Sequence, residues 1–316
     1  MIKSALEYQS PMVKLFFLLV LSIGSLSVFL FFSSLVMKLL WGFDFISDPT
    51  LLENFSDPFV VDANRLMLLF QHFGLFIVPS LIFLYVSTRN PRNFILWSRQ
   101  YSIKDLLMVI VILIAIMPFI NLLIVWNGGL HLPDFLSGVE NMMRNMEDAA
   151  ALLTDAIVSM DSLSEYLYMV IIVAILPAIG EELMFRGIIQ RLFAQQFHSY
   201  HAGIWISAFF FSAIHFQFFG FFPRLLLGVA FGYLLVYSGN IIYPMVGHFV
   251  NNFTSLTFAY LIQHGMIDEN IDTIGANSEW LFILPGLALG AFLFYLLWKK
   301  RNIGMDLMYV ERGGLL

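Results

Sequence analysis

Residues 166–186 read YLYMVIIVAILPAIGEELMFR and combine two features that seldom share one segment. No charged residue occurs from 166 to 180, and the mostly apolar stretch from 166 to 184 is about as long as the roughly 20 residues that a membrane-spanning helix needs. The segment 166–186 ends with Glu181, Glu182 and Arg186. Ionisable groups inside a membrane are costly unless they are paired or hydrated, and they often mark function. The stretch therefore predicts a spanning helix that carries a site.

The rest of the chain has the composition of a membrane protein. Of its 316 residues 59% are apolar and only 12% are charged, whereas soluble domains have about 25% charged residues. The mean hydropathy is +0.83. These values exclude a soluble enzyme, a disordered protein and a nucleic-acid-binding protein, and the net charge of −6 also argues against nucleic acid as a partner. With no cysteine, disulfides, thiolate metal sites and cysteine nucleophiles are excluded.

Apolar runs of spanning length predict an all-α, polytopic membrane protein with about eight transmembrane helices. The predicted spans are 12–40, 66–86, 106–126, 166–184, 204–219, 225–237, 241–262 and 280–298. The first run is too long for a cleavable signal peptide and is expected to remain as a span. The fifth and sixth runs are short, and Phe221-Phe222-Pro223 between them predicts a tight turn.

The distribution of basic residues predicts the orientation of these spans. With the N-terminus inside, twelve of the sixteen Lys and Arg residues face the cytoplasm: Lys3, Lys14, Arg89, Arg92, Arg99, Lys104, Arg186, Arg191, Lys299, Lys300, Arg301 and Arg312. The far side receives Lys38, Arg65, Arg144 and Arg224. This split follows the positive-inside rule. It predicts two cytoplasmic termini in a multi-pass protein of the cell membrane, and we expect a bacterial cytoplasmic membrane.

No internal repeat or low-complexity linker divides the chain, which is therefore expected to be one transmembrane domain, 1–316. Within it, residues 1–163 are expected to supply supporting helices and a far-side loop. Residues 164–265 are expected to carry the active site, and residues 266–316 the last span and a cytoplasmic tail. The loop at 127–163 has apolar and acidic residues in a pattern that predicts short amphipathic helices at the membrane interface.

The charged residues of the fourth span are expected to have unequal roles. On a helix, Glu182 and Arg186 are four residues apart and can pair. Glu181 is rotated by about 100° from Glu182, so it is left free to face a cavity as a proton acceptor. The alternative is that all three residues form one structural ion-pair cluster.

A helical hairpin centred near position 198 would bring a second polar residue level with Glu181. Glu181 and His215 are equally far from that centre along the sequence, so they should face one another at similar depth. Phe211 lies one helical turn before His215. The alternative is that His215 is a buried histidine with a purely structural hydrogen bond.

The seventh span supplies a third polar pair, His248 and Asn252, which are four residues apart and share one helix face. Both side chains can donate hydrogen bonds, so the pair suits a polarised carbonyl oxygen, as in an oxyanion hole. Interhelical hydrogen bonding is the alternative. Asn251 is expected to point elsewhere.

Three spaced motifs are now present in order: Glu181-Glu182-x-x-x-Arg186, Phe211-x-x-x-His215 and His248-x-x-x-Asn252. Together they resemble the CAAX prenyl protease and bacteriocin-processing family, also called CPBP or Abi, over residues 166–261. The resemblance implies an intramembrane glutamate endopeptidase. It also implies that Glu181 and His215 activate water, that His248 and Asn252 stabilise the oxyanion, and that Glu182, Arg186 and Phe211 support them.

The substrate implied is a membrane-associated peptide or protein, either prenylated or of the leader type. No cofactor or metal is expected. A zinc site formed by Glu181, His215 and His248 is the second mechanism considered, because two histidines and one glutamate form a known catalytic ligand set. The alternative function is that of a non-catalytic membrane protein, either an immunity factor or a proton-coupled carrier. A carrier usually shows matching halves with broken helices, which this sequence lacks.

Overall fold

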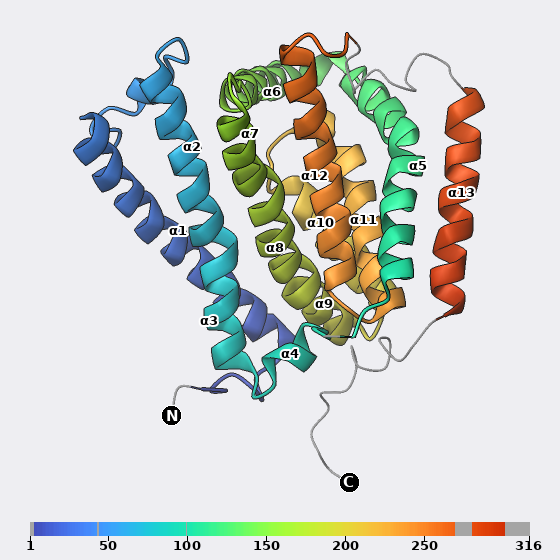
Figure 1. Cartoon of the computed structure of the whole chain (residues 1–316). Helices are drawn as coiled ribbons and strands as arrows, with labels where there is room; N and C mark the ends of the chain where they lie inside the picture. The colour runs from blue at the N-terminus through green and yellow to red at the C-terminus, as the bar shows by residue number, and fades with distance from the viewer. Residues whose placement is uncertain (1–2, 43, 99, 269–279, 301–316) are drawn as a thin grey trace.

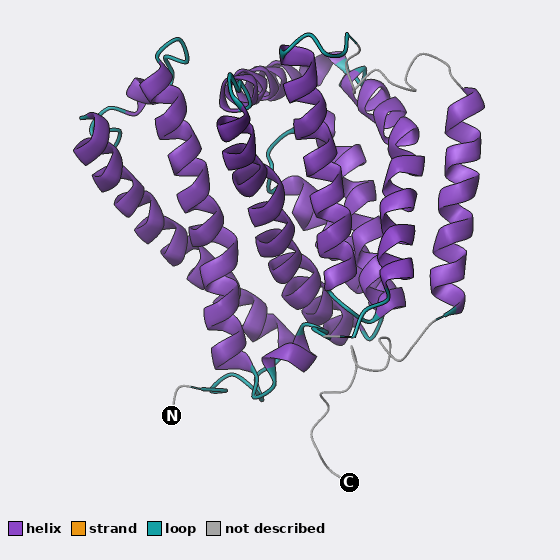
Figure 2. Ribbon diagram, viewed as in Figure 1, coloured by secondary structure: helices purple, strands orange, loops and turns teal. Residues whose placement is uncertain are grey.

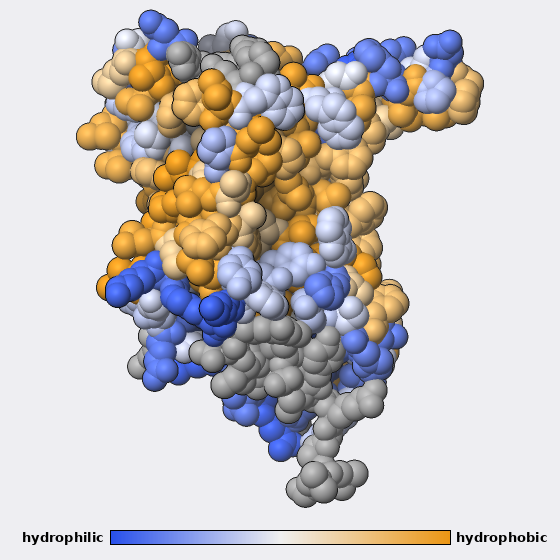
Figure 3. Space-filling model, turned by 90° about the vertical axis from the view of Figure 1, so that its right-hand side faces the viewer, coloured by the Kyte–Doolittle hydropathy of each residue, from blue (hydrophilic) through white to orange (hydrophobic). Residues whose placement is uncertain are grey.

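The computed structural model describes the chain except for residues 1–2, 43, 99, 269–279 and 301–316. The described residues form helices joined by loops and turns, without strands (Figure 2). The helices lie side by side as a bundle (Figure 1). On the face shown in Figure 3, apolar residues form a broad belt and hydrophilic residues gather above and below it. This distribution is expected where lipid surrounds the middle of a protein and water surrounds its two ends.

One side of the bundle is a helical hairpin. It consists of α1 (Pro11–Trp41) and a second, continuous rod made of α2 (Pro58–His72), the π-helical segment Phe73–Ile77 and α3 (Val78–Ser87). Ser10 caps α1 by accepting a hydrogen bond from the Val13 N–H, and Gly42 ends the helix with φ +77°. Both residues are typical of helix termini, because serine satisfies a free N–H and glycine adopts the left-handed conformation without strain.

The opposite side consists of α5 (Ile103–Gly128) and α13 (Trp280–Lys299), which pack against each other. The short α4 (Pro91–Phe94) precedes α5. At one end of the bundle, α6 (Ser137–Ile157) runs across the ends of other helices (Figure 1). This single helix replaces the several short helices predicted for the 127–163 loop, and a 3-10 turn, Asp134–Leu136, precedes it.

A long kinked rod occupies the centre of the bundle. It runs from Leu163 to Phe197 and contains α7 (Leu163–Met169), α8 (Leu176–Glu182) and α9 (Gln190–Phe197), separated by π-helical segments at Val170–Ile175 and Leu183–Ile189. A π-helical turn holds an extra residue and changes which side chains face inward, and such turns often occur at functional sites.

Three further helices pack near this rod: α10 (Tyr200–Ala213), α11 (Phe221–Ser238) and α12 (Ile242–Gln263). The predicted hairpin between the fourth and fifth apolar runs is confirmed, because α9 ends at Phe197, His198 adopts φ +51° and α10 begins at Tyr200. A Cβ at Gly203 would lie 2.8 Å from the Ala194 Cβ, so a glycine is needed where these two helices meet. The tight turn predicted at Phe221-Phe222-Pro223 is wrong, since these residues form the first turn of α11.

Six described helical segments are long and apolar enough to cross a membrane: Pro11–Trp41, Pro58–Ser87, Ile103–Gly128, Leu163–Phe197, Phe218–Ser238 and Trp280–Lys299. They make the chain a multi-pass membrane protein. The other two predicted spans do not reach this standard. The 14 residues of α10 extend only about 21 Å. The 22 residues of α12 include His248, Asn251 and Asn252, which lower its hydropathy. The count of eight spans stays a prediction, and the proposed tail at 301–316 lies outside the described residues.

Candidate active site

The predicted pairing of Glu182 with Arg186 is present in the centre of the bundle. Arg186 Nη1 donates to Glu182 Oε1 over 2.8 Å, and the two side chains are 1% and 0% exposed. Arg186 Nη2 donates to the Gly228 carbonyl at 3.1 Å. The guanidinium carbon lies 4.3 Å from the ring centroid of Phe211, within the range of a cation–π contact. The pair is thus enclosed by α10 and α11 as well as by its own helix.

His248 of α12 lies between the two glutamates. Its Nδ1 is 2.8 Å from Glu182 Oε1, and its Nε2 is 3.9 Å from Glu181 Oε2. The imidazole is stacked on the Phe231 ring with a centroid separation of 5.4 Å. An ionised carboxylate can only accept hydrogen bonds, so with Glu182 ionised the Nδ1 carries the hydrogen. The Nε2 is then the nitrogen that faces Glu181.

The candidate catalytic residues surround one cavity. Its volume is about 450 Å³, and its lining includes Glu181, His215, His248 and Asn252, together with Phe211. Glu182 and Arg186 do not line it and lie behind His248 and Phe211. Glu181 and His248 are 6% and 5% exposed. The structure therefore separates the two glutamates as the rotation argument predicted, with Glu181 at the cavity wall and Glu182 in the packed interior.

His215 lies just beyond the last residue of α10, in the connection to α11. Its Nδ1 donates to the Phe211 carbonyl at 2.8 Å, because a carbonyl oxygen can only accept. In a neutral ring the Nε2 is therefore unprotonated and available as a proton acceptor. The next residue, Phe216, has φ +54°, a conformation that is strained for a bulky side chain. Glu181 and His215 line the same cavity but are not joined by a direct hydrogen bond.

Asn252 and Asn251 both line the cavity, so the expectation that Asn251 points elsewhere is wrong. Asn252 Nδ2 donates to the Val173 carbonyl at 2.9 Å, and Asn251 Nδ2 donates to Asn252 Oδ1 at 3.1 Å. Val173 belongs to the π-helical segment Val170–Ile175. The Asn252 carboxamide is thereby held by two partners and retains one N–H for another acceptor.

Two cavity residues were missed by the sequence analysis. His72, at the end of α2, is 8% exposed, and its Nδ1 has no hydrogen-bond partner among the described residues. No spacing rule in the sequence links His72 to the motifs at 181–252. Arg224 also lines the cavity. It was assigned to a far-side loop because the Phe-Phe-Pro sequence before it was interpreted as a turn, whereas it lies in the first turn of α11.

The described residues contain no group of three His, Asp or Glu side chains placed to hold a metal ion. Glu181, His215 and His248, the set considered for zinc, share the cavity without converging on one point. Glu181 and His248 approach to 3.9 Å, while the Nδ1 of His215 is occupied by a backbone carbonyl.

Known proteins resemble the part of the chain that forms this site. Residues 163–254 match the family of type II CAAX prenyl endopeptidases, Rce1-like. This segment is an Rce1-like domain. It contains Glu181, His215, His248 and Asn252, whereas α1, α5 and α13 lie outside it.

The Rce1-like domain also contains most of α12 and both central π-helical segments. A curated relative, the uncharacterized protein YpbD of Bacillus subtilis (strain 168), is 29% identical to this chain over 85 residues. That alignment covers 26% of this chain and 40% of YpbD, so the chain spans less than half of its relative. No solved structure matches the chain.

Proposed function

We propose that the protein is an intramembrane endopeptidase that hydrolyses a peptide bond of a membrane-associated substrate. The observation that carries the proposal is the position of His248 between Glu181 and Glu182, at the wall of a cavity that is also lined by His215 and Asn252. The Rce1-like domain supports it, because its family is one of endopeptidases. The substrate is thus a peptide or protein.

In the proposed reaction Glu181 accepts a proton from water, with help from His215. The water oxygen attacks the carbonyl carbon of the scissile bond and forms a tetrahedral intermediate. The C–N bond then breaks, and the proton held by Glu181 moves to the leaving amine nitrogen. A carboxylate that first accepts and then donates the same proton is ordinary general acid–base chemistry. The presence of Glu181 and His215 in the lining of one cavity supports these roles.

The intermediate needs hydrogen-bond donors where negative charge develops. Asn252 has one N–H left after its bond to Val173, and its orientation is fixed by Asn251 and the π-helical segment. When both ring nitrogens of His248 carry a hydrogen, its Nε2 is a second donor. Glu182 then accepts the hydrogen bond from Nδ1 and balances the positive charge of the ring. Glu182 and Arg186 therefore act by holding His248 and do not line the cavity, whereas Phe211 contacts the His248 ring and also lines the cavity.

The helices and charges also support a membrane arrangement. We propose that α10 and α12 complete eight crossing segments, with both termini in the cytoplasm of a bacterial cell. The start of α1 and the end of α13 lie at the same end of the bundle, opposite α6 (Figure 1). The domain assignment follows: residues 164–265 form the active site, and the helices on either side support it.

Cleavage of fluorogenic peptides by the full-length protein in detergent tests the proposal. The panel contains peptides with and without a lipidated cysteine near the C-terminus. We expect cleavage by the wild type and none by Glu181→Gln. Glu53→Gln is the matched control, since Glu53 is exposed in the loop after α1 and should retain full turnover. An unreactive panel, or equal turnover by Glu181→Gln, would overturn the peptidase proposal.

A further inference from the structure

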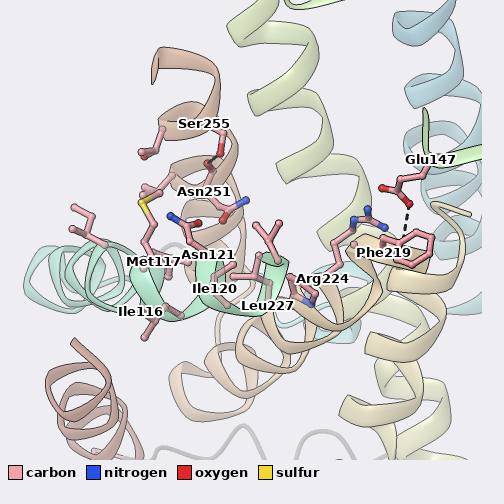
Figure 4. A pocket seen from close by; sticks show the side chains of 17 residues that line it. Ile116, Met117, Ile120, Asn121, Glu147, Phe219, Arg224, Leu227, Asn251 and Ser255 are labelled. Carbon is pink, nitrogen blue, oxygen red and sulfur yellow. Dashed lines mark hydrogen bonds between the residues drawn. The ribbon is translucent and has the colours of Figure 1, made fainter. Parts of the chain in front are cut away.

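A second cavity adjoins the one that contains Glu181. Its volume is about 320 Å³, and it lies between α5, α11 and α12 (Figure 4). Much of its lining is apolar: Leu113, Ile114, Ile116, Met117, Ile120, Ile124, Phe219, Pro223, Leu227 and Val250. Arg224, Leu227 and Asn251 line both cavities. These three residues form the wall that the two cavities share.

Arg224 is the positive charge at this shared wall, and no carboxylate of the described residues lies within 4 Å of its guanidinium nitrogens. Its Nη2 donates to Gln217 Oε1 at 2.8 Å, and its Nη1 donates to the Gln217 carbonyl at 3.4 Å. Among the ion pairs of the described residues, none includes Arg224. Glu147 and Glu181 act on Arg224 electrostatically from beyond that distance. Glu147 lines this cavity and accepts a hydrogen bond from the Phe219 N–H at 3.3 Å (Figure 4).

The local backbone leaves room for this guanidinium. A Cβ at Gly220 would overlap Arg224 Nη2, so the side chain occupies space that only a glycine leaves open. The φ of Gly220 is −109°, a value open to any residue, so a side chain at this position would act only by displacing the Arg224 guanidinium. A guanidinium that is positioned in this way, and whose hydrogen bonds all go to the neutral Gln217, can still form an ion pair with a carboxylate ligand that enters the cavity.

We propose that Arg224 binds the free C-terminal carboxylate of the peptide substrate, whose last residues occupy the cavity between α5, α11 and α12. This inference rests on the proposed function, because it takes the Glu181 cavity as the place where the bond is cut. A guanidinium can donate two parallel hydrogen bonds to a carboxylate. Asn121 lines the cavity away from Arg224, beside apolar side chains that suit a short apolar peptide (Figure 4).

The test measures binding without cleavage. Glu181→Gln protein in detergent is titrated with a fluorescein-labelled, farnesylated four-residue peptide that ends either in a free carboxylate or in an amide. We expect the acid to bind about 10- to 100-fold more tightly than the amide, the usual effect of a hydrogen bond to a charged group. Adding Arg224→Gln should abolish the difference and leave amide binding unchanged, which also shows that the variant is folded.

Two further variants make the test specific. Gly220→Ala keeps the charge and displaces the guanidinium, so it should also reduce the preference for the acid. Arg89→Gln removes an exposed cation at a remote site and should retain the full preference. Equal binding of acid and amide by Glu181→Gln, absence of binding, or an acid preference that survives Arg224→Gln would each overturn the inference.

A lipid phosphate is the other anion that Arg224 could bind. In that case Arg224→Gln would reduce the phosphatidylglycerol that the protein retains and leave the ratio of acid to amide affinity unchanged, which would overturn the inference. Wild-type cleavage of the acid peptide is measured in parallel. If the protein binds the acid more tightly than the amide but does not cleave the peptide, the peptidase proposal fails and the carboxylate site stands. If the protein cleaves the peptide but binds acid and amide equally, the carboxylate site fails and the peptidase proposal stands.

Discussion

Glu182 and His248 belong to different helices and are joined by a hydrogen bond of 2.8 Å between Oε1 and Nδ1. The same carboxylate oxygen accepts a hydrogen bond from Arg186 Nη1 at 2.8 Å. One buried oxygen therefore connects α12 to the long central rod and sets the orientation of the imidazole that faces Glu181. Glu182 is therefore a packed structural partner of His248, whereas Glu181 faces the cavity, and the two roles predict different effects on stability and turnover.

Exchange of either glutamate for glutamine should separate activity from stability. Glu181→Gln should remove nearly all turnover with little change in Tm. Glu182→Gln should lower the Tm in detergent, because loss of one partner of a buried ion pair costs about 3–5 kcal/mol, and His248 loses its anchor as well. Differential scanning fluorimetry and the peptide assay measure the two effects. Equal turnover losses in two equally stable variants would contradict this division of roles.

Removal of the Asn252 carboxamide should slow the chemical step. As an oxyanion donor, Asn252 is expected to contribute about 10²–10³ in turnover, with little effect on substrate binding. Asn252→Ala should therefore lower kcat and leave KM nearly unchanged. Asn251→Ala is the neighbouring comparison and should lose less than about tenfold, since it only orients Asn252. Similar losses in the two variants would argue against a direct role for Asn252.

Elemental analysis separates water activation by Glu181 and His215 from a zinc mechanism. A zinc enzyme holds the ion through deprotonated ligands, and its bound water has a pKa near 7. We expect purified, active protein to contain far less than one mole of zinc per mole and to keep its activity with a chelator. Stoichiometric zinc, with activity lost on chelation and restored by zinc, would instead make His215 and His248 metal ligands.

Single cysteines can test the membrane orientation, because the chain has none of its own. Gln100→Cys lies before α5 and Ser137→Cys at the start of α6, and both positions are exposed. In intact cells, an impermeant maleimide should label position 137 and leave position 100 unlabelled until the cells are lysed. Labelling of position 100 but not 137 would reverse the orientation. Gly275, another site for such a test, lies outside the described residues.

The start of α6 should show a pH-dependent stability. Hydrogen bonds from Arg144, the Leu132 N–H and His131 lower the pKa of Glu140 to about 2 from its ordinary value of 4.5. Because this pKa is depressed, its stabilising effect is complete above pH 4.5 and is lost as the pH falls toward 2. Amide exchange at residues 130–144 should therefore be faster in Glu140→Gln than in wild type at pH 7, and the difference should narrow between pH 4.5 and 2. A difference that stays constant with pH would contradict this account.

The sequence by itself determined what depends on local spacing. The 3.6-residue helical period places Arg186 next to Glu182, and both are in contact in the structure. The helical hairpin that was predicted near position 198 is present between α9 and α10. Long apolar runs predicted helices of spanning length because a bilayer imposes that length on any helix that crosses it. The rotation of Glu181 away from Glu182 follows from the same period.

Tertiary structure alone decided which side chains meet across helices. The bond from His248 to Glu182 joins residues 66 positions apart, and no spacing rule within one helix predicts it. His72 reaches the cavity from α2, and Arg224 reaches it because the Phe-Phe-Pro sequence starts a helix there instead of forming a turn. The π-helical segments changed the register locally and exposed the Val173 carbonyl to Asn252. These contacts depend on how whole helices pack against one another, and the local period of the chain does not specify that packing.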